Sequence, residues 1–308
     1  MPEEFSVKAV VLREYGGPDK LKYEEWTDPA VGAGQVLVRV SAAGVNPIDY
    51  KLRSGAMQAF MPLTFPAILG YDFSGVVRAV GPNANGFAPG DKVFGRCAQT
   101  YAQFVVADVV GVAKLPDGLD LVDAAALPVI TNTGEQIITR AIKIQPGQTV
   151  VVTGALGSVG RAAVWVARKA GATVIAAVRG SQVKAAAALG ANDVLALDDE
   201  AAVKRLAPVD AVADTVGAEV AEAMIAKVKP RGVFATVTGP PANAKEHPEI
   251  RVEMVQSAPD PATMRSLGED VAAGRLVIPV ERMLPLAEAA TAHEAAEKGG
   301  IGKILLIA

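Results

Sequence analysis

The sequence has few side chains that bind metals or undergo redox chemistry. Its 308 residues include one cysteine, Cys97, and two histidines, His247 and His293. A lone cysteine cannot form an internal disulfide bond. These three residues are also too few for a zinc site built mainly from Cys and His, which takes four ligands. We therefore expect no disulfide and no bound metal.

The sequence also lacks an excess of either charge and any long apolar run. It carries 30 Lys and Arg against 33 Asp and Glu, a net charge of −3, which argues against a nucleic-acid-binding surface. No stretch approaches the roughly 18 apolar residues that span a bilayer. The acidic start Met1–Glu4 precedes no apolar run, so we expect no signal peptide. We predict a cytoplasmic protein with neither nucleic-acid nor membrane partners.

Hydrophobic residues make up 51% of the chain, enough for a sizeable core, and the length fits two modest domains. The first hundred or so residues contain short β-branched runs between Gly- and Pro-containing turns. These runs cover residues 7–12, 35–40, 76–80 and 92–94. Several short strands of this kind predict a β-rich barrel or sandwich.

The pattern changes near residue 120. Residues 119–142 read as helical with a break at Pro128, and strands then alternate with helices. The expected strands are 149–153, 173–178, 193–196, 209–214 and 232–237, and the expected helices are 158–170, 181–189 and 218–228. This alternation predicts βαβ units in a doubly wound parallel sheet, and so an α/β protein. The tail predicts a helix over 261–273, a strand over 277–280, a helix over 286–298 and a strand over 303–307, and we expect it to fold back onto the first domain.

The segment Gly154-Ala155-Leu156-Gly157-Ser158-Val159-Gly160 is a variant of the dinucleotide-binding fingerprint. It follows a five-residue β run and opens a helix with a small apolar face. Glycines there allow a tight turn, close approach to a pyrophosphate and tight helix–sheet packing. The helix N-terminus supplies free N–H groups and a partial positive charge. We therefore predict that a dinucleotide binds at Gly154, Gly157, Ser158, Val159 and Gly160.

The end of the second strand indicates which dinucleotide binds. An NAD site places an acid there for the ribose 2′-hydroxyl, whereas this chain has Arg179 followed by Ser181 and Lys184. A guanidinium suits a 2′-phosphate, so we predict NADPH with these three residues in contact. The alternative is that Arg179 is an ordinary solvated side chain.

Two further strand ends are expected to form the cofactor crevice, because ligands bind beyond the carboxyl ends of parallel strands. Asp214 and Val216 follow one strand, and Val237 and Thr238 follow another. Ordinary turn chemistry is the alternative for each of them.

Several motifs in a fixed order carry a family resemblance. They are Val45-Asn46-Pro47-Ile48-Asp49-Tyr50-Lys51, Gly70-Tyr71-Asp72-Phe73-Ser74-Gly75-Val76-Val77, Val80-Gly81-Pro82, Pro89-Gly90-Asp91-Lys92-Val93-Phe94-Gly95 and the glycine turn at Gly154. Together they resemble the medium-chain dehydrogenase/reductase superfamily, in its zinc-independent quinone oxidoreductase and enone reductase branch. The resemblance covers nearly the whole chain.

The resemblance implies a discontinuous GroES-like catalytic domain, residues 1–125 and 263–308, around a central NADP-binding Rossmann domain, residues 126–262. It also implies an active-site cleft between them and usually a homodimer. Zinc-dependent members have Cys near the present Asn46, a His-Glu pair where this chain has Tyr71-Asp72, and a four-cysteine lobe. Their absence implies hydride transfer to an acceptor that is already electrophilic, a quinone or an α,β-unsaturated carbonyl. Residues 129–135 resemble the enone reductase side of the branch.

The resemblance also suggests site residues. Lys51 is the first candidate to stabilise the developing oxyanion, Asn46 would hold the nicotinamide ribose or the substrate oxygen, and Tyr50 or Tyr71 would line the pocket or relay a proton. Thr131 lies on the nicotinamide side in the family, and Lys303 is a candidate for a phosphate contact. A turn-forming role for Asn46 and a plain surface charge at Lys51 are the alternatives. A non-catalytic NADPH-binding redox sensor or structural protein is the alternative function, because fold alone does not establish catalysis.

Overall fold

The computed structural model describes residues 7–300 and 302–308. The acidic start on which the expected absence of a signal peptide rests lies outside them. Contacts divide the chain into two units: the described part of residues 1–129 together with 259–308, and residues 130–258. These limits differ by four residues at each crossing from the predicted domain limits. The functional division into a catalytic and a cofactor domain stays a prediction.

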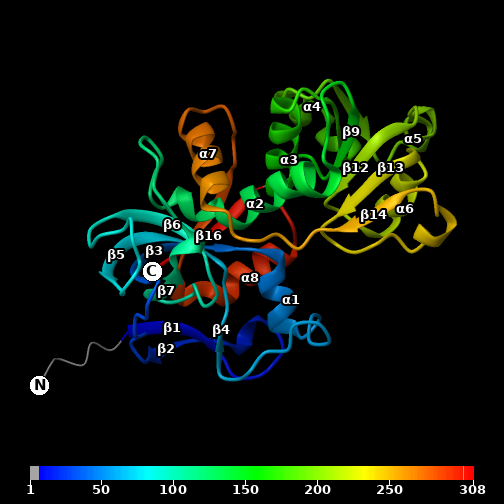
Figure 1. Ribbon diagram of the computed structural model, residues 1–308. Helices are drawn as coiled ribbons and strands as arrows, with labels where there is room; N and C mark the ends of the chain where they lie inside the picture. The colour runs from blue at the N-terminus through cyan, green and yellow to red at the C-terminus, as the bar shows by residue number, and fades with distance from the viewer. Residues whose placement is uncertain (1–6, 301) are drawn as a thin grey trace, which may run out of the picture. The chain divides into compact units, whose positions relative to one another are not determined.

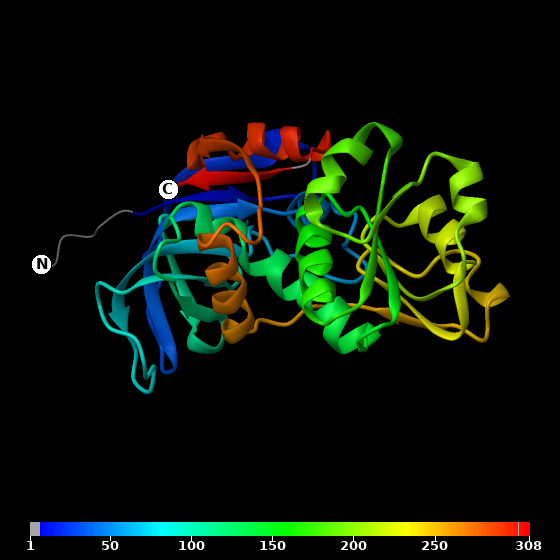
Figure 2. The same cartoon turned by 90° about the horizontal axis from the view of Figure 1, so that it is seen from above.

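The first unit is built on two sheets. The larger has the order β15-β16-β3-β5-β6-β8 with β7 paired to β3, and the smaller has the order β2-β1-β4. The strands are β1 (Val7–Leu12), β2 (Leu21–Trp26), β3 (Gln35–Val45), β4 (Ala67–Ile68), β5 (Asp72–Val80), β6 (Lys92–Arg96), β7 (Phe104–Asp108), β8 (Val112–Lys114), β15 (Val280–Pro285) and β16 (Lys303–Ile307). The tail folds back as predicted, since β16 pairs antiparallel with β3 at Ile304 and Val45 (Figure 2).

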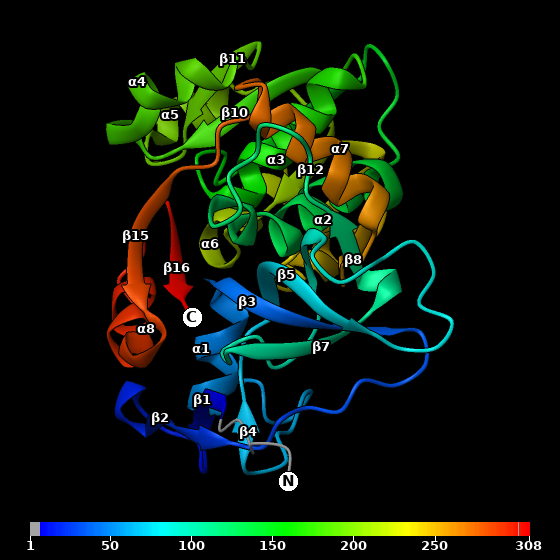
Figure 3. The ribbon, with the colours of Figure 1, turned by 90° about the vertical axis from the view of Figure 1, so that its left-hand side faces the viewer.

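In the described part of this unit, three α-helices lie wholly within its limits: α1 (Pro47–Ser54), α7 (Pro261–Ala272) and α8 (Ala289–Glu297). The first one begins directly after β3, with Asn46 at the N-cap and Pro47 in the first turn, a position that suits proline. Figure 3 shows α8 beside β15 and β16, and it contacts both strands. These contacts bring the start of α1, the start of β16 and α8 into one region of the unit.

The second unit contains a six-stranded sheet in the order β11-β10-β9-β12-β13-β14, with every pairing parallel. The strands are β9 (Thr149–Thr153), β10 (Thr173–Val178), β11 (Asp193–Ala196), β12 (Val209–Asp214), β13 (Val228–Thr236) and β14 (Arg251–Met254). The chain order reverses between β9 and β12, as it does at the ligand-binding switch point of a doubly wound sheet. The predicted parallel α/β sheet is therefore confirmed.

The second unit also contains helices, two of which precede β9 in the sequence. They are α2 (Pro128–Gln136), which begins in the first unit, a π-helical segment (Ile137–Ile142), α3 (Ser158–Lys169), α4 (Val183–Ala186), α5 (Glu200–Arg205) and α6 (Ala218–Ile225). In Figure 1, α3 lies on one side of the strands, where it contacts β9 and β10. The helix α6 lies on the other side, against β12 and β13. Gly134 lets α2 approach α3 closely, since a Cβ there would lie 2.5 Å from the Ala162 Cβ.

Several element limits differ from the sequence-based expectations. The helix expected over 218–228 ends at Ile225 because Val228 already begins β13, and the strand expected over 277–280 is displaced to Val280–Pro285. Strands β2, β4, β7, β8 and β14 and the short α5 were not predicted. Short 3₁₀ segments cover Pro18–Lys20, Val109–Gly111, Asp123–Ala126, Gly180–Gln182, Ala187–Leu189, Ala244–Glu246 and Leu286–Glu288. No helix in the described part of the chain is both long and apolar enough to cross a bilayer.

Candidate active site

The glycine turn lies between the end of β9 and the start of α3. Gly154 has a φ of +60°, and the N–H of Gly157 donates to its carbonyl oxygen at 2.8 Å, which closes the turn. A Cβ on Gly160 would lie 2.2 Å from the Gly154 oxygen, so only glycine fits there. The first N–H groups of a helix have no intrahelical acceptor, and α3 offers these groups at Ser158 and Val159. The turn therefore fits the diphosphate of a dinucleotide.

A buried carboxylate joins the strand ends around this turn. Asp214, at the end of β12, is fully buried and accepts hydrogen bonds from the hydroxyls of Thr153 on β9 and Thr236 on β13, both at 2.8 Å. The Gly217 N–H donates to the same carboxylate at 3.1 Å and the Thr238 hydroxyl at 3.2 Å. Because both carboxylate oxygens accept inside the unit, Asp214 fixes the geometry of the strand ends.

The structure brings most of the predicted cofactor residues to this edge of the sheet. The Val237 N–H donates to the Asp214 carbonyl at 3.1 Å, and a Cβ on Gly154 would lie 3.0 Å from the Val216 side chain. Val216 itself is 45% exposed, so an apolar side chain stands open to solvent beside the glycine turn. Thr131 is fully buried on α2.

Three more cofactor candidates follow β10. Arg179, Ser181 and Lys184 are all exposed, and residues 179–184 contain no acid. Among the described residues, neither Arg179 nor Lys184 forms an ion pair. The two cations are therefore available to an anionic ligand.

The first unit contains a buried polar cluster where β3 passes into α1. The Asn46 amide donates to Asp72 Oδ2 at 2.8 Å, and its carbonyl oxygen accepts from Lys303 Nζ at 2.7 Å. Lys303 also donates to the Val45 carbonyl at 3.1 Å and lies 3.4 Å from Asp72. The pairing of β16 with β3 carries Lys303 into this cluster, where it is 5% exposed. This placement gives no support to the predicted phosphate contact of Lys303, and the side chain of Asn46 is already engaged at both ends.

A directional chain of hydrogen bonds leads away from α1. An arginine can only donate, so the contact of 3.4 Å from Arg53 Nη1 to His293 Nδ1 assigns the proton of a neutral imidazole to Nε2. That nitrogen lies 3.3 Å from the Tyr101 hydroxyl, which donates in turn to Asp49 Oδ2 at 2.9 Å. Arg53 also pairs with Glu297, at the end of α8. The chain thus runs from a partly exposed acid to a fully buried one.

Burial shifts the pKa values of two members of this chain, Asp49 and His293. Desolvation raises the pKa of Asp49 to about 7, although hydrogen bonds from the Asn46 N–H and from Tyr101 oppose that shift. Desolvation, and then the charge of Arg53, lowers the pKa of His293 to about 3. Among the described residues, Asp49 Oδ1 has no hydrogen-bond partner, so the carboxyl is incompletely compensated. The sequence did not predict this chain, because Arg53 and His293 are 240 residues apart.

The predicted catalytic residues on and beside α1 are more accessible. Lys51 is exposed, and no hydrogen bond or ion pair of its ammonium occurs among the described residues. Tyr50 and Tyr71 are half-buried, and burial raises the pKa of each phenol above its usual value. Both phenols are therefore protonated at neutral pH and can donate a hydrogen bond.

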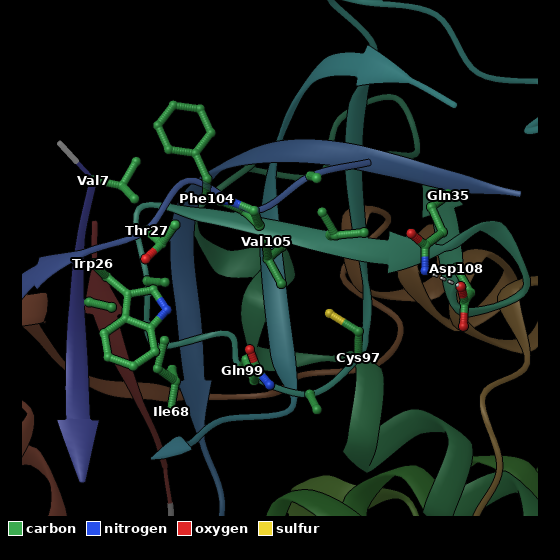
Figure 4. Close-up of a pocket in the computed structure, with 16 residues that line it drawn as sticks. Val7, Trp26, Thr27, Gln35, Ile68, Cys97, Gln99, Phe104, Val105 and Asp108 are labelled. Atoms are coloured by element: carbon green, nitrogen blue, oxygen red, sulfur yellow. Dashed lines mark hydrogen bonds between the residues drawn. The ribbon is translucent and has the colours of Figure 1, made fainter. Parts of the chain in front are cut away.

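A cavity of about 420 Å³ lies elsewhere in the first unit, beside β1, β2 and β7. Figure 4 shows Trp26 and Phe104 at its rim, the Cys97 sulfur pointing inward, and the hydrogen bond of 2.9 Å from Gln35 to Asp108. None of the predicted site residues lines it. Burial raises the pKa of the Cys97 thiol, so this cysteine is a poor nucleophile.

Two family models match the chain, each over a different stretch. An alcohol dehydrogenase GroES-like domain matches residues 32–118, and a zinc-binding dehydrogenase domain matches residues 189–306. Among the described residues, no group of three or more His, Cys, Asp or Glu side chains could hold a metal ion.

Quinone oxidoreductases and a related reductase resemble the chain. A 2-haloacrylate reductase from Burkholderia is 30% identical over 98% of this chain and 99% of its own length. Human quinone oxidoreductase is 37% identical over 172 residues, 55% of this chain, and the match spans about half (52%) of that relative. The solved quinone oxidoreductase of Coxiella burnetii has a TM-score of 0.88 at 30% identity, covering 98% of this chain and 99% of that one. A mycobacterial homologue solved with NADPH has a TM-score of 0.85 at 26% identity, covering 98% and 100%.

These similarities identify the class: oxidoreductases that combine a GroES-like domain with a parallel-sheet domain for a nicotinamide cofactor. The chain belongs to the medium-chain dehydrogenase/reductase superfamily, in its quinone oxidoreductase branch.

Proposed function

We propose that the protein is an NADPH-dependent reductase that transfers hydride, without a metal, to a quinone or an α,β-unsaturated carbonyl. The observation that carries this proposal is the closed glycine turn after β9 together with Arg179 after β10, in a loop without an acid. An unpaired guanidinium at that strand end suits a 2′-phosphate, whereas NAD sites place an acid there.

The chain's own residues would bind and orient the reactants. The first N–H groups of α3 would hold the diphosphate, and Arg179, with Ser181 and Lys184, would hold the 2′-phosphate. When bound, the nicotinamide supplies the hydride. The exposed ammonium of Lys51 would then stabilise negative charge on the acceptor's carbonyl oxygen, more in the transition state than in the ground state. The protonated Tyr71 or Tyr50 would donate a hydrogen bond or a proton.

The acceptor class rests on the relatives. The human relative is named for quinones, and the Burkholderia relative, which matches over its whole length, is named for a haloacrylate, an activated alkene. Both acceptors are electrophilic before any catalyst acts on them. A metal is therefore not required to polarise them.

A steady-state screen of NADPH oxidation tests the proposal. It compares simple benzoquinones with short and long enones by kcat/KM. We expect turnover with at least one of the two classes. We also expect a lower kcat/KM for Lys51→Ala but not for Lys22→Ala, a matched loss of an exposed lysine on β2. Tight NADPH binding without turnover across the panel would instead favour a sensor or structural role. Oxidation of primary alcohols with NADP⁺ that depends on added zinc would overturn the proposal.

A homodimer is part of the same proposal, by analogy with the family. Light scattering on the purified chain in solution would measure its mass, and a monomer would contradict this part.

A further inference from the structure

The side chain of Asp198, which follows β11, contacts the loop that follows β10. The Leu197 N–H donates to the Val178 carbonyl at 2.7 Å, which extends the contact between the two strands past the end of β11. The next residue, Asp198, accepts the N–H of Gly180 on Oδ1 at 2.6 Å. Asp198 thus binds the main chain directly after Arg179.

The Gly180 N–H is a group that an anionic ligand could otherwise use. Main-chain N–H groups in turns bind phosphates, above all beside cationic side chains. Arg179 precedes Gly180, and Lys184 lies a few residues beyond it. Asp198 pairs with neither cation, because no ion pair joins it to them among the described residues. Its carboxylate therefore occupies an anion-binding position while both cations remain free.

We infer that Asp198 is a specificity-determining residue at this strand end: its carboxylate competes with a 2′-phosphate for the Gly180 N–H and weakens NADPH relative to NADH. The inference rests on the proposed function, in which Arg179 binds that phosphate. Arg179 and Asp198 act in opposite directions, the first favouring the phosphorylated ribose and the second disfavouring it. The protein then uses both nicotinamide cofactors with only a modest preference for NADPH.

The size of the effect follows from Coulomb's law in a solvated loop. A phosphate with a charge near −2 that lies roughly 7 Å from a carboxylate loses about three- to tenfold in affinity at water-like dielectric. NADH has no charge on its 2′-hydroxyl and should be almost unaffected. Because both groups are exposed, added salt should reduce the effect on NADPH.

The experiment measures the Kd of NADPH and of NADH by fluorescence titration at low and at high salt. Asp198→Asn removes the charge and keeps an oxygen that accepts the Gly180 N–H, so the loop should keep its geometry. Asp198→Ala also frees the N–H. Asp193→Asn is the matched control, since Asp193 is an exposed acid at the start of β11, the strand that Asp198 follows. Circular dichroism and thermal melts check that each variant is folded.

We expect Asp198→Asn to tighten NADPH about three- to tenfold at low salt, with less effect at high salt and little change for NADH. Asp193→Asn should change neither Kd. A wild-type protein that binds NADPH while Asp198→Asn leaves its Kd unchanged would overturn this inference alone, as would equal tightening of the two cofactors. A wild-type protein that binds NADH but not NADPH would overturn the proposed cofactor, and this inference with it.

Discussion

The buried pair Asp49 and His293 should give the first unit opposing pH dependences that cancel. Folding raises the pKa of Asp49 to about 7 from its usual 3.8. The folded state therefore holds this proton more tightly than the unfolded chain does. The stabilisation that Asp49 contributes is complete below about pH 3.8 and is lost as the pH rises through about 7. Over that window, the free energy of unfolding falls by up to about 1.4 kcal/mol per pH unit.

The sign is reversed for His293. Folding lowers its pKa to about 3 from 6.5, so between these values the unfolded chain binds more protons than the folded one. Its contribution is complete above about pH 6.5 and is lost as the pH falls through about 3, again by up to about 1.4 kcal/mol per pH unit. From about pH 4.5 to 6.5 the two slopes oppose each other. The pair should therefore leave the stability of the wild-type unit nearly independent of pH.

Removing either member should expose the slope of the other. The free energy of unfolding of His293→Gln should fall by about 2 kcal/mol relative to wild type between pH 4.5 and 6.5, and that of Asp49→Asn should rise by a similar amount. Ionisable groups elsewhere are common to all three proteins and cancel in these differences. Only the pH dependence of each difference is informative, because either substitution also changes stability at every pH.

The assay is urea unfolding followed by tryptophan fluorescence. The chain has two tryptophans, Trp26 in the first unit and Trp165 on α3 in the second. A Trp165→Phe background therefore leaves Trp26 to report on the unit that holds the buried pair. For each variant, the difference in the free energy of unfolding from wild type should vary with pH. If both differences are independent of pH, Asp49 is not an acid with a raised pKa and His293 is not a base with a lowered one.

Three further outcomes follow from the geometry. Arg179→Ala should weaken NADPH binding by about 1.5–3 kcal/mol with little loss for NADH, and titration of the two cofactors measures it; equal losses would contradict a 2′-phosphate contact. Gly160→Ala should lower the melting temperature and weaken NADPH binding more than tenfold, because the added Cβ would lie 2.2 Å from the Gly154 carbonyl oxygen. Gly157→Ala is the milder control, since its Cβ would lie 3.1 Å from the same oxygen, and similar losses in the two variants would contradict this steric argument. Lys303→Met should lower the free energy of unfolding, measured in urea, by about 3–5 kcal/mol, because the Asp72 carboxylate stays buried without its cation. Adding Asp72→Asn to this variant should recover part of that stability, and an unchanged stability of Lys303→Met would show that the ion pair contributes little.

The architecture was predictable because its signals are local. The strands β9, β10 and β12 and the glycine turn all come from short runs with one period or one motif, and tertiary packing did not override them. The predicted limits of helices and strands were wrong where packing or pairing with a neighbouring element determines where an element begins or ends. The helix after Gly217 ends early because the chain must enter β13 at Val228, and β14 forms because it pairs with β13 at the edge of the sheet.

The candidate site was predictable only where function depends on main-chain geometry. The turn at Gly154 and Gly160 was predicted from the spacing of its glycines and from its place between a β run and a helix. Lys303 was associated with a phosphate because the sequence predicts that the tail folds back but not that β16 pairs with β3 and buries this ammonium. The hydrogen bonds of His293 with Arg53 and Tyr101 could not be predicted, because these partners lie 240 and 192 residues away in the sequence.

Acidic residues at strand ends have different roles in this chain, and exposure distinguishes them. Asp214 and Asp72 are fully buried and use their oxygens on neighbouring strand ends and on main-chain N–H groups. A buried carboxylate with all its acceptors engaged cannot bind a ligand without breaking the hydrogen bonds that position the strands. Asp198 is exposed and has a single hydrogen-bond partner in the part of the chain that the structure describes, so its carboxylate can yield to a ligand or repel one at small structural cost. Recognition of the cofactor's 2′ substituent should therefore depend on exposed side chains such as Arg179 and Asp198, while the buried acids keep the sheet edge in place.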